Sequence, residues 1–108
     1  FIVSDERAGD EDVIRRVNAV IKTANDFRRE NPEEAVRITA DFLNVPIEPL
    51  MAESQLARLP SSAEYEELTR GGQVENWFGT LASLYEQFGK IEDPLPASEF
   101  YLGDLYAE

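Results

Sequence analysis

The sequence predicts a mainly α-helical chain that carries one short strand at its N-terminus. Two stretches, 13–27 and 74–88, repeat apolar residues at the 3.6-residue period of an amphipathic helix. A third helix is indicated by Asn31-Pro32-Glu33-Glu34, because asparagine caps helices well and proline fits their first position. The length of 108 residues allows one domain at most.

The N-terminal residues 1–4 are expected to form the strand. Phe1, Ile2 and Val3 are apolar and β-prone, and polar residues and Gly9 follow them. The chain starts without an initiator methionine, and its first apolar run is too short for a secretory signal. We therefore expect that the strand has lost its partners and that the chain has been cut from a longer protein.

The first long helix is predicted over 10–30. Asp10, Glu11 and Asp12 place negative charge at the helix start, where the helix dipole favours it. Two of these acids have an arginine four residues further on, Arg15 for Glu11 and Arg16 for Asp12. This spacing predicts two ion pairs on the helix surface.

Two shorter helices are predicted over 32–43 and 47–58. Glu34 stands three residues after Asn31, the spacing of a capping box. The helix over 32–43 is expected to stop near Asn44, because the residue before Pro46 avoids the helical conformation. The segment 60–62 is a predicted loop, and 63–68 is compatible with either extended chain or a helical turn.

A fourth helix is predicted over 70–89, with Thr69 as its cap and Gly89 as its stop. Gly71 and Gly72 weaken its first turn by roughly 1 kcal/mol each. The rest, 90–108, is expected to be an ordered tail without regular structure, anchored by aromatic side chains: Phe100, Tyr101 and Tyr106. The chain thus divides into a strand at 1–4, a helical region at 10–89 and a tail at 90–108.

Charge and composition exclude several classes of function. The chain has 22 acidic and 10 basic residues, a net charge of −12, and its basic residues are scattered. Binding to nucleic acid or to an anionic membrane requires clustered Lys and Arg, so we expect neither partner. No segment approaches the roughly 20 apolar residues that cross a bilayer, which predicts no membrane insertion.

Cysteine and histidine are both absent. Their absence excludes disulfides and thiolate metal sites, and it removes the commonest general base and transition-metal ligand. Ser62 and Ser83 therefore have no base that could activate them as nucleophiles. We expect no catalytic residues, no cofactor and no metal site in this chain.

Clustered carboxylates are the remaining candidates for a metal or acid–base site. They are Asp10-Glu11-Asp12, Glu33-Glu34 and Glu66-Glu67. None has the alternating ligands and central glycine of a calcium loop, and adjacent exposed acids rarely differ in pKa as catalytic pairs must. We interpret the first two clusters as charge that complements helix ends, and the third as part of a solvated face.

Two further patterns have a structural and a functional interpretation. Gly71-Gly72 before a helix could hold an anion with backbone N–H groups, but a loose turn is favoured. The stretch 74–88 contains four aromatic residues: Trp77, Phe78, Tyr85 and Phe88. They could form a ligand platform, but at strict helical spacing they are expected in the core.

Four segments, taken in order, resemble the C-terminal part of nitrate/sulfonate/taurine-type solute-binding proteins of ABC importers, a family with relatives that bind thiamine precursors. They are Phe1-Ile2-Val3-Ser4-Asp5, Glu30-Asn31-Pro32-Glu33-Glu34-Ala35, Phe88-Gly89-Lys90-Ile91, and Pro94 with Phe100-Tyr101 and Tyr106. The resemblance covers nearly the whole chain, and the Asn-Pro-Glu-Glu-Ala junction is its most specific part. The region 59–73 matches poorly, and Gly71-Gly72 departs from the family's usual helix start.

The resemblance implies a piece of a two-lobed α/β periplasmic-binding-protein fold, with 1–4 as a strand that crosses between the lobes. It implies binding of a small solute outside the cytoplasm and delivery to an ABC permease, without catalysis. Family ligand contacts come mainly from loops that this chain does not contain, so the ligand-binding residues stay unknown.

Two other functions remain open at this point. An acidic helical interaction or dimerisation module predicts that the stripes 13–27 and 74–88 pair with each other. An enzyme, like some thiamine-pyrimidine synthases of similar fold, would need reactive groups outside this segment. We also expect the isolated chain to leave apolar surface uncovered and to self-associate, because a monomer rarely exposes large apolar patches.

Overall fold

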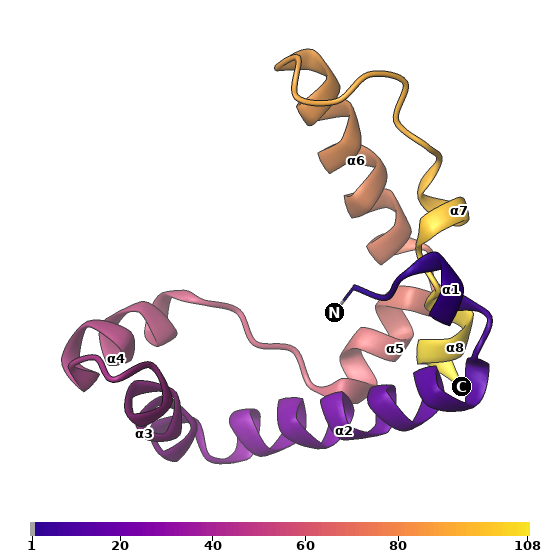
Figure 1. The fold of residues 1–108 in the computed structure, drawn as a ribbon. Coiled ribbons are helices and arrows are strands. Elements are labelled where there is room, and N and C mark those ends of the chain that lie inside the picture. Colours follow the sequence, from indigo (N-terminus) through magenta and orange to yellow (C-terminus); the bar gives the residue numbers. More distant parts are fainter. Residues whose placement is uncertain (1) are drawn as a thin grey trace. The chain divides into compact units, whose positions relative to one another are not determined.

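The computed structural model describes residues 2–108, and these form eight helices and no strand (Figure 1). The helices are α1 (Asp5–Ala8), α2 (Glu11–Glu30), α3 (Pro32–Leu43), α4 (Ile47–Leu56), α5 (Ser62–Arg70), α6 (Gln73–Gln87), α7 (Ala97–Phe100) and α8 (Gly103–Ala107). The chain divides into two compact units. Unit 1 comprises Phe1–Asn18 with Glu64–Glu108, and unit 2 comprises Ala19–Ala63.

The predicted N-terminal strand is wrong for Ile2–Ser4, which have no regular structure, while Phe1 lies outside the described residues. A strand needs a second strand to exchange backbone hydrogen bonds with, and residues 2–108 form none. The carbonyl of Ser4 instead accepts hydrogen bonds from the backbone N–H groups of Arg7 and Ala8, which begins α1.

Helix α2 follows the prediction closely, from Glu11 to Glu30. The predicted ion pairs are confirmed: Arg15 lies 2.9 Å from Glu11 and Arg16 lies 3.1 Å from Asp12. Asp10 stands just before the helix, and its carboxylate accepts a hydrogen bond from the backbone N–H of Val13 at 3.3 Å. Asp10 therefore caps the start of α2, and Glu11 and Asp12 form ion pairs on its surface.

In unit 2, α3 has the predicted bounds and packs against α4. The side chain of Asn31 does not cap α3; its amide donates to the carbonyl of Phe27 at 3.2 Å. The predicted stop is confirmed, because Asn44 has a left-handed φ of 53° and the N–H of Val45 reaches the carbonyl of Ala40 at 3.1 Å. This is a Schellman ending with asparagine in the glycine position.

The open segment 63–68 is helical, as part of α5. Thr69 lies inside α5 and does not cap α6, so that prediction is wrong; its hydroxyl instead bonds the Tyr101 hydroxyl at 2.8 Å. Gly72 has a left-handed φ of 73°, which delays the start of α6 to Gln73. Gly89, with φ 62°, ends α6 as predicted, since the N–H of Lys90 bonds the carbonyl of Tyr85 at 2.8 Å.

The tail is ordered, but it contains two short helices, α7 and α8, where we predicted no regular structure. Helix α7 packs against α6. Phe100 meets Phe78 edge to face with ring centroids 5.9 Å apart, and Tyr101 meets the same ring at 5.1 Å. Two of the three predicted aromatic anchors therefore hold the tail to α6.

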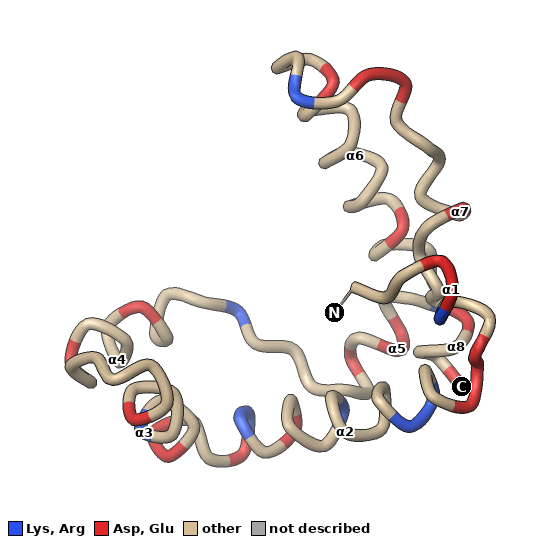
Figure 2. Tube along the Cα trace, viewed as in Figure 1, with Lys and Arg blue, Asp and Glu red and all other residues tan. Residues whose placement is uncertain are grey.

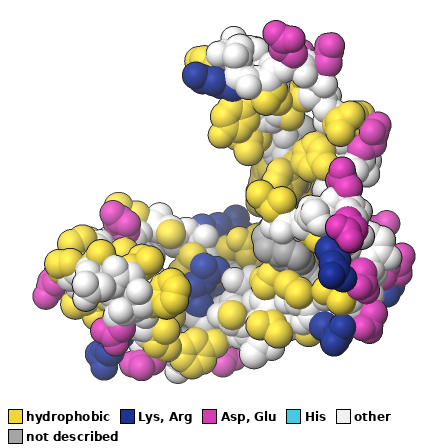
Figure 3. Space-filling view, viewed as in Figure 1, with side chains coloured by type: hydrophobic (Ala, Val, Ile, Leu, Met, Phe, Trp, Pro, Cys, Tyr) yellow, Lys and Arg dark blue, Asp and Glu magenta, His cyan; other side chains and the backbone are white. Residues whose placement is uncertain are grey.

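The core is small. Among residues 2–108, the buried apolar side chains are Ile14, Ala40, Pro60 and Ala97. The expectation that Trp77, Phe78, Tyr85 and Phe88 form a core is wrong within this chain, because all four are exposed. Hydrophobic side chains gather along α6 (Figure 3), and one of its rings, Phe78, contacts Phe100 of α7 and the following Tyr101.

Candidate functional site

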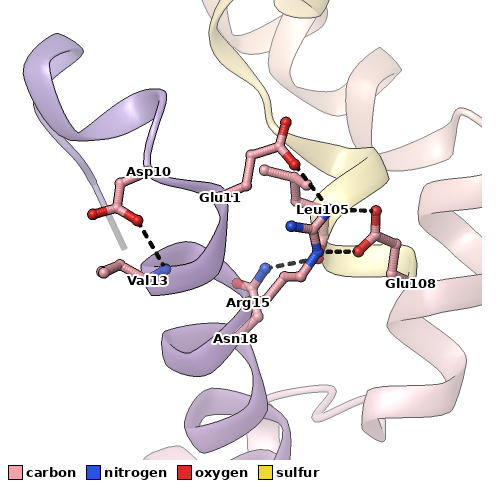
Figure 4. A network of polar contacts seen from close by, with 7 residues as sticks. All are labelled: Asp10, Glu11, Val13, Arg15, Asn18, Leu105 and Glu108. Atoms are coloured by element: carbon pink, nitrogen blue, oxygen red, sulfur yellow. Dashed lines mark hydrogen bonds and ion pairs between the residues drawn. The ribbon is translucent and has the colours of Figure 1, made fainter.

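The most connected polar cluster lies in unit 1, where α8 meets the first half of α2 (Figure 4). The guanidinium of Arg15 donates to both carboxylate oxygens of Glu108, at 3.0 Å from Nη2 to Oε1 and through a shorter contact from Nε to Oε2. The same Nη2 donates to Glu11 at 2.9 Å. One arginine thus bridges two carboxylates that lie 93 and four residues away along the chain.

A buried amide completes this cluster. Asn18 is only 6% exposed, and its Nδ2 donates to the backbone carbonyl of Leu105 at 3.0 Å. On the α5 side, Arg70 donates to the carbonyl of Ala107 through a short contact and to Glu66 at 3.3 Å. We call Arg15, Asn18, Arg70 and the α8 groups that they bind the C-terminal clamp.

The contacts of the C-terminal clamp hold the C-terminal helix α8 in place. The hydrogen bonds that Arg15 donates to Glu108, and then to Glu11, raise its pKa further above its already high ordinary value, so this charge is permanent. Nε and Nη2 of the guanidinium are held by two carboxylates of the chain itself. The clamp therefore fixes α8.

Replacing Asn18 with alanine is expected to lower the free energy of unfolding by about 1 kcal/mol, because the Leu105 carbonyl loses its donor. The higher helix propensity of alanine offsets part of a larger loss. Urea unfolding followed by circular dichroism measures the change. Thr23→Ala, at an exposed position of the same helix, is the control and should be neutral or slightly stabilising. Equal effects of the two variants would contradict the role of the amide.

A second polar contact lies in unit 2 and joins α2 to the start of α5. The carboxylate of Asp26 accepts a hydrogen bond from the backbone N–H of Ser62 at 2.8 Å and another from its hydroxyl at 2.6 Å. These bonds, the hydroxyl first, lower the pKa of Asp26. Asp26 thus caps a helix that begins 36 residues further along the chain.

The lowered pKa of Asp26 predicts an acid-sensitive contribution to stability. A carboxyl group with a depressed folded-state pKa stabilises the fold above its unfolded pKa of about 3.9 and loses that effect as the pH falls through the folded-state value. Asp26→Asn should therefore be less stable than the original chain at neutral pH, and the difference should shrink below about pH 4. Urea midpoints for both proteins across this range measure it. A difference that does not depend on pH would rule out the charged cap.

The structure disperses the candidate acids. Asp10, Glu11 and Asp12 each have their own partner, as described above, and do not converge on a common point. Glu34 lies 3.6 Å from Arg37, and Glu66 pairs with Arg70. Glu67 is exposed, while its neighbour Glu66 binds Arg70, so the two acids do not form an acid–base couple. Among residues 2–108, no group of three or more Asp and Glu side chains is placed to hold a metal ion.

The glycine pair and the two serines also have local roles. The N–H groups of Gly71 and Gly72 bond the carbonyls of Glu67 and Thr69, at 2.9 and 3.0 Å, so they close a turn and do not face an anion. Ser83 donates to the carbonyl of Gly79 within α6. Ser62 donates to Asp26, without a histidine between them. These residues form no catalytic constellation.

Sequence reasoning missed the residues that make the long-range contacts: Asn18, Asp26, Ser62 and Glu108. Local patterns carry no signal for pairs separated by 36 to 93 residues.

None of the helices in the described part of the chain, 2–108, is long and apolar enough to span a bilayer.

Comparison with known proteins adds a direct observation. The chain is 37% identical over 107 residues to proteins named "Putative binding protein" from Brucella abortus (strain 2308), Brucella suis biovar 1 and Brucella melitensis biotype 1. It resembles one part of them. The match covers 98% of the chain but 34% of each relative, so the chain spans about a third of their length. No family model matches the chain. No solved structure matches it either.

Proposed function

We propose that this chain is part of a longer solute-binding protein that captures a small solute outside the cytoplasm and delivers it to an ABC importer. The observation that carries the proposal is 37% identity, over 98% of the chain, to relatives named as binding proteins. The order of the four segments that resemble the nitrate/sulfonate/taurine type supports the same function. The solute would belong to the nitrate, sulfonate, taurine or thiamine-precursor class.

In this proposal the residues described here have no catalytic role and do not contact the solute. Their strongest polar groups already serve the fold: Arg15 binds Glu11 and Glu108, and Asp26 binds Ser62. The two-lobed α/β fold would be completed by sequence that corresponds to the rest of the relatives. The ABC permease would contact the complete protein.

The alternative, an acidic helical interaction module, requires the stripes of α2 and α6 to bury each other. The 37% identity to proteins named as binding proteins favours solute binding over such a module. We therefore favour the solute-binding function.

The test is a thermal-shift screen of the longer protein that contains this chain, against nitrate, alkanesulfonates, taurine and pyrimidine precursors of thiamine. One class should raise the melting temperature in a saturable way, because a ligand that binds only the native state stabilises it by mass action. The isolated chain is the control and should not respond. If no class shifts the longer protein, the proposed solute range is wrong.

A further inference from the structure

Helix α6 carries an apolar surface that the described residues of unit 1 leave exposed. Three side chains of α6 and that of Phe88, the residue just after it, follow one another at spacings of four, three and four residues, which places them on one face of a helix. All four are exposed: Trp77 by 48%, Leu81 by 47%, Leu84 by 43% and Phe88 by 75%. We call Trp77, Leu81, Leu84 and Phe88 the α6 seam.

The neighbouring flank of the same helix is already in use. Phe78 meets Phe100 and Tyr101 on the tail, and α7 packs against α6. The seam continues that apolar face around the helix without a polar boundary between them. A face this wide is typical of a helix that is packed in a globular core, because a two-stranded coiled coil uses only a narrow stripe.

Charge is almost absent from α6. Residues Gln73–Gln87 contain two acids, Glu75 and Glu86, and no Lys or Arg, although 30% of the whole chain is charged. Figure 2 shows the middle of α6 free of charged residues. A helix face that is exposed to solvent usually has charged residues beside its apolar ones. Because α6 has few charged residues, the seam has the composition of a buried surface.

We infer that the α6 seam is the surface on which the rest of the longer protein packs; this rests on the proposed function, in which the chain is one part of that protein. The relatives are about three times as long as the match, since it covers 34% of them, so a large partner in the same polypeptide is available. A second copy fits less well, because each copy has a net charge of −12 and would bring that charge to the contact.

Hydroxyl-radical footprinting, read peptide by peptide with mass spectrometry, tests this inference in the 108-residue chain and in the longer protein. The oxidation rate at Trp77, the single tryptophan of the chain, should fall about fivefold or more in the longer protein, as a side chain that is 48% exposed becomes a core residue. Unchanged oxidation at Trp77 would overturn the inference. So would protection of Trp77 in the longer protein that appears only as its concentration rises, because the seam would then bind a second copy.

A pair of charge substitutions gives a second readout. Leu81→Glu should leave the helix content of the isolated chain unchanged, because this position is exposed there. In the longer protein it should prevent folding or strongly lower the melting temperature, since it would bury an unpaired charge. Ser83→Glu, on the far side of α6, is the matched control and should be tolerated in both.

If the Leu81→Glu protein cannot be recovered, Leu81→Ala replaces it, and its melting temperature should fall in the longer protein but not in the chain. Equal behaviour of the Leu81 and Ser83 variants in the longer protein would contradict the inference. The two proposals can fail separately. If Trp77 is protected in the longer protein but no solute binds, the inference about the α6 seam stands and the proposed function is wrong.

Discussion

Replacing Ile14 with alanine is expected to lower the free energy of unfolding by about 2–5 kcal/mol. Ile14 is 2% exposed and is the largest of the buried apolar side chains in residues 2–108. Removing its methyl and methylene groups forfeits their burial and leaves a cavity in a core that has few other members. Urea unfolding of the isolated chain, followed by the helix signal in circular dichroism, measures this loss.

Val20→Ala is the matched control for Ile14→Ala. Val20 lies in the same helix and is also β-branched, but it is 69% exposed. Its replacement should change stability by no more than about 0.5 kcal/mol, and the better helix propensity of alanine favours a small gain. If the two variants lost stability equally, Ile14 would not be a core residue.

The second large effect is expected at Gly103, which is buried at the start of α8. A β-carbon there would lie 2.6 Å from Cε1 of Tyr101 and 3.0 Å from Cγ2 of Thr69. The Tyr101 ring cannot move freely, because its hydroxyl bonds Thr69 and its face meets Phe78. Gly103→Ala should therefore cost about 1–3 kcal/mol through overpacking.

Gly79→Ala shows what the same substitution does without a steric conflict. Gly79 lies inside α6, and nothing stands within 4 Å of the position of its missing β-carbon. Alanine there should stabilise the helix by roughly 0.5–1 kcal/mol, because glycine loses more backbone freedom on folding. Thermal unfolding of both variants gives the comparison. A stabilising Gly103→Ala would mean that Tyr101 does not pack where the structure places it.

The helices were predictable because their signals are local. The periodic apolar residues of 13–27, the Asn31-Pro32 start and the left-handed stops at Asn44 and Gly89 lie within a few residues of the features that they determine. The same holds for the Arg15–Glu11 pair, at a spacing of one helical turn.

The contacts between helices were not predictable, because they join residues that are distant in sequence. Nothing in the neighbourhood of Asp26 indicates that it caps a helix at Ser62, and nothing near Thr69 indicates that Tyr101 will bind its hydroxyl. The predicted strand failed at Ile2–Ser4 for a related reason: apolar β-prone residues have only a preference for strand, and a strand forms only where another strand pairs with it. The periodicity of α6 likewise identified an apolar face without identifying what covers it.

Titration calorimetry, with the longer protein and the 108-residue chain side by side, tests the proposed function most directly. Each is titrated with the solute class that stabilises the longer protein in the thermal-shift screen. Saturable binding of one solute molecule per longer protein, with no heat of binding for the isolated chain, is the predicted result. Binding by the chain alone, or a longer protein that binds no nitrate, sulfonate, taurine or thiamine precursor, would contradict it.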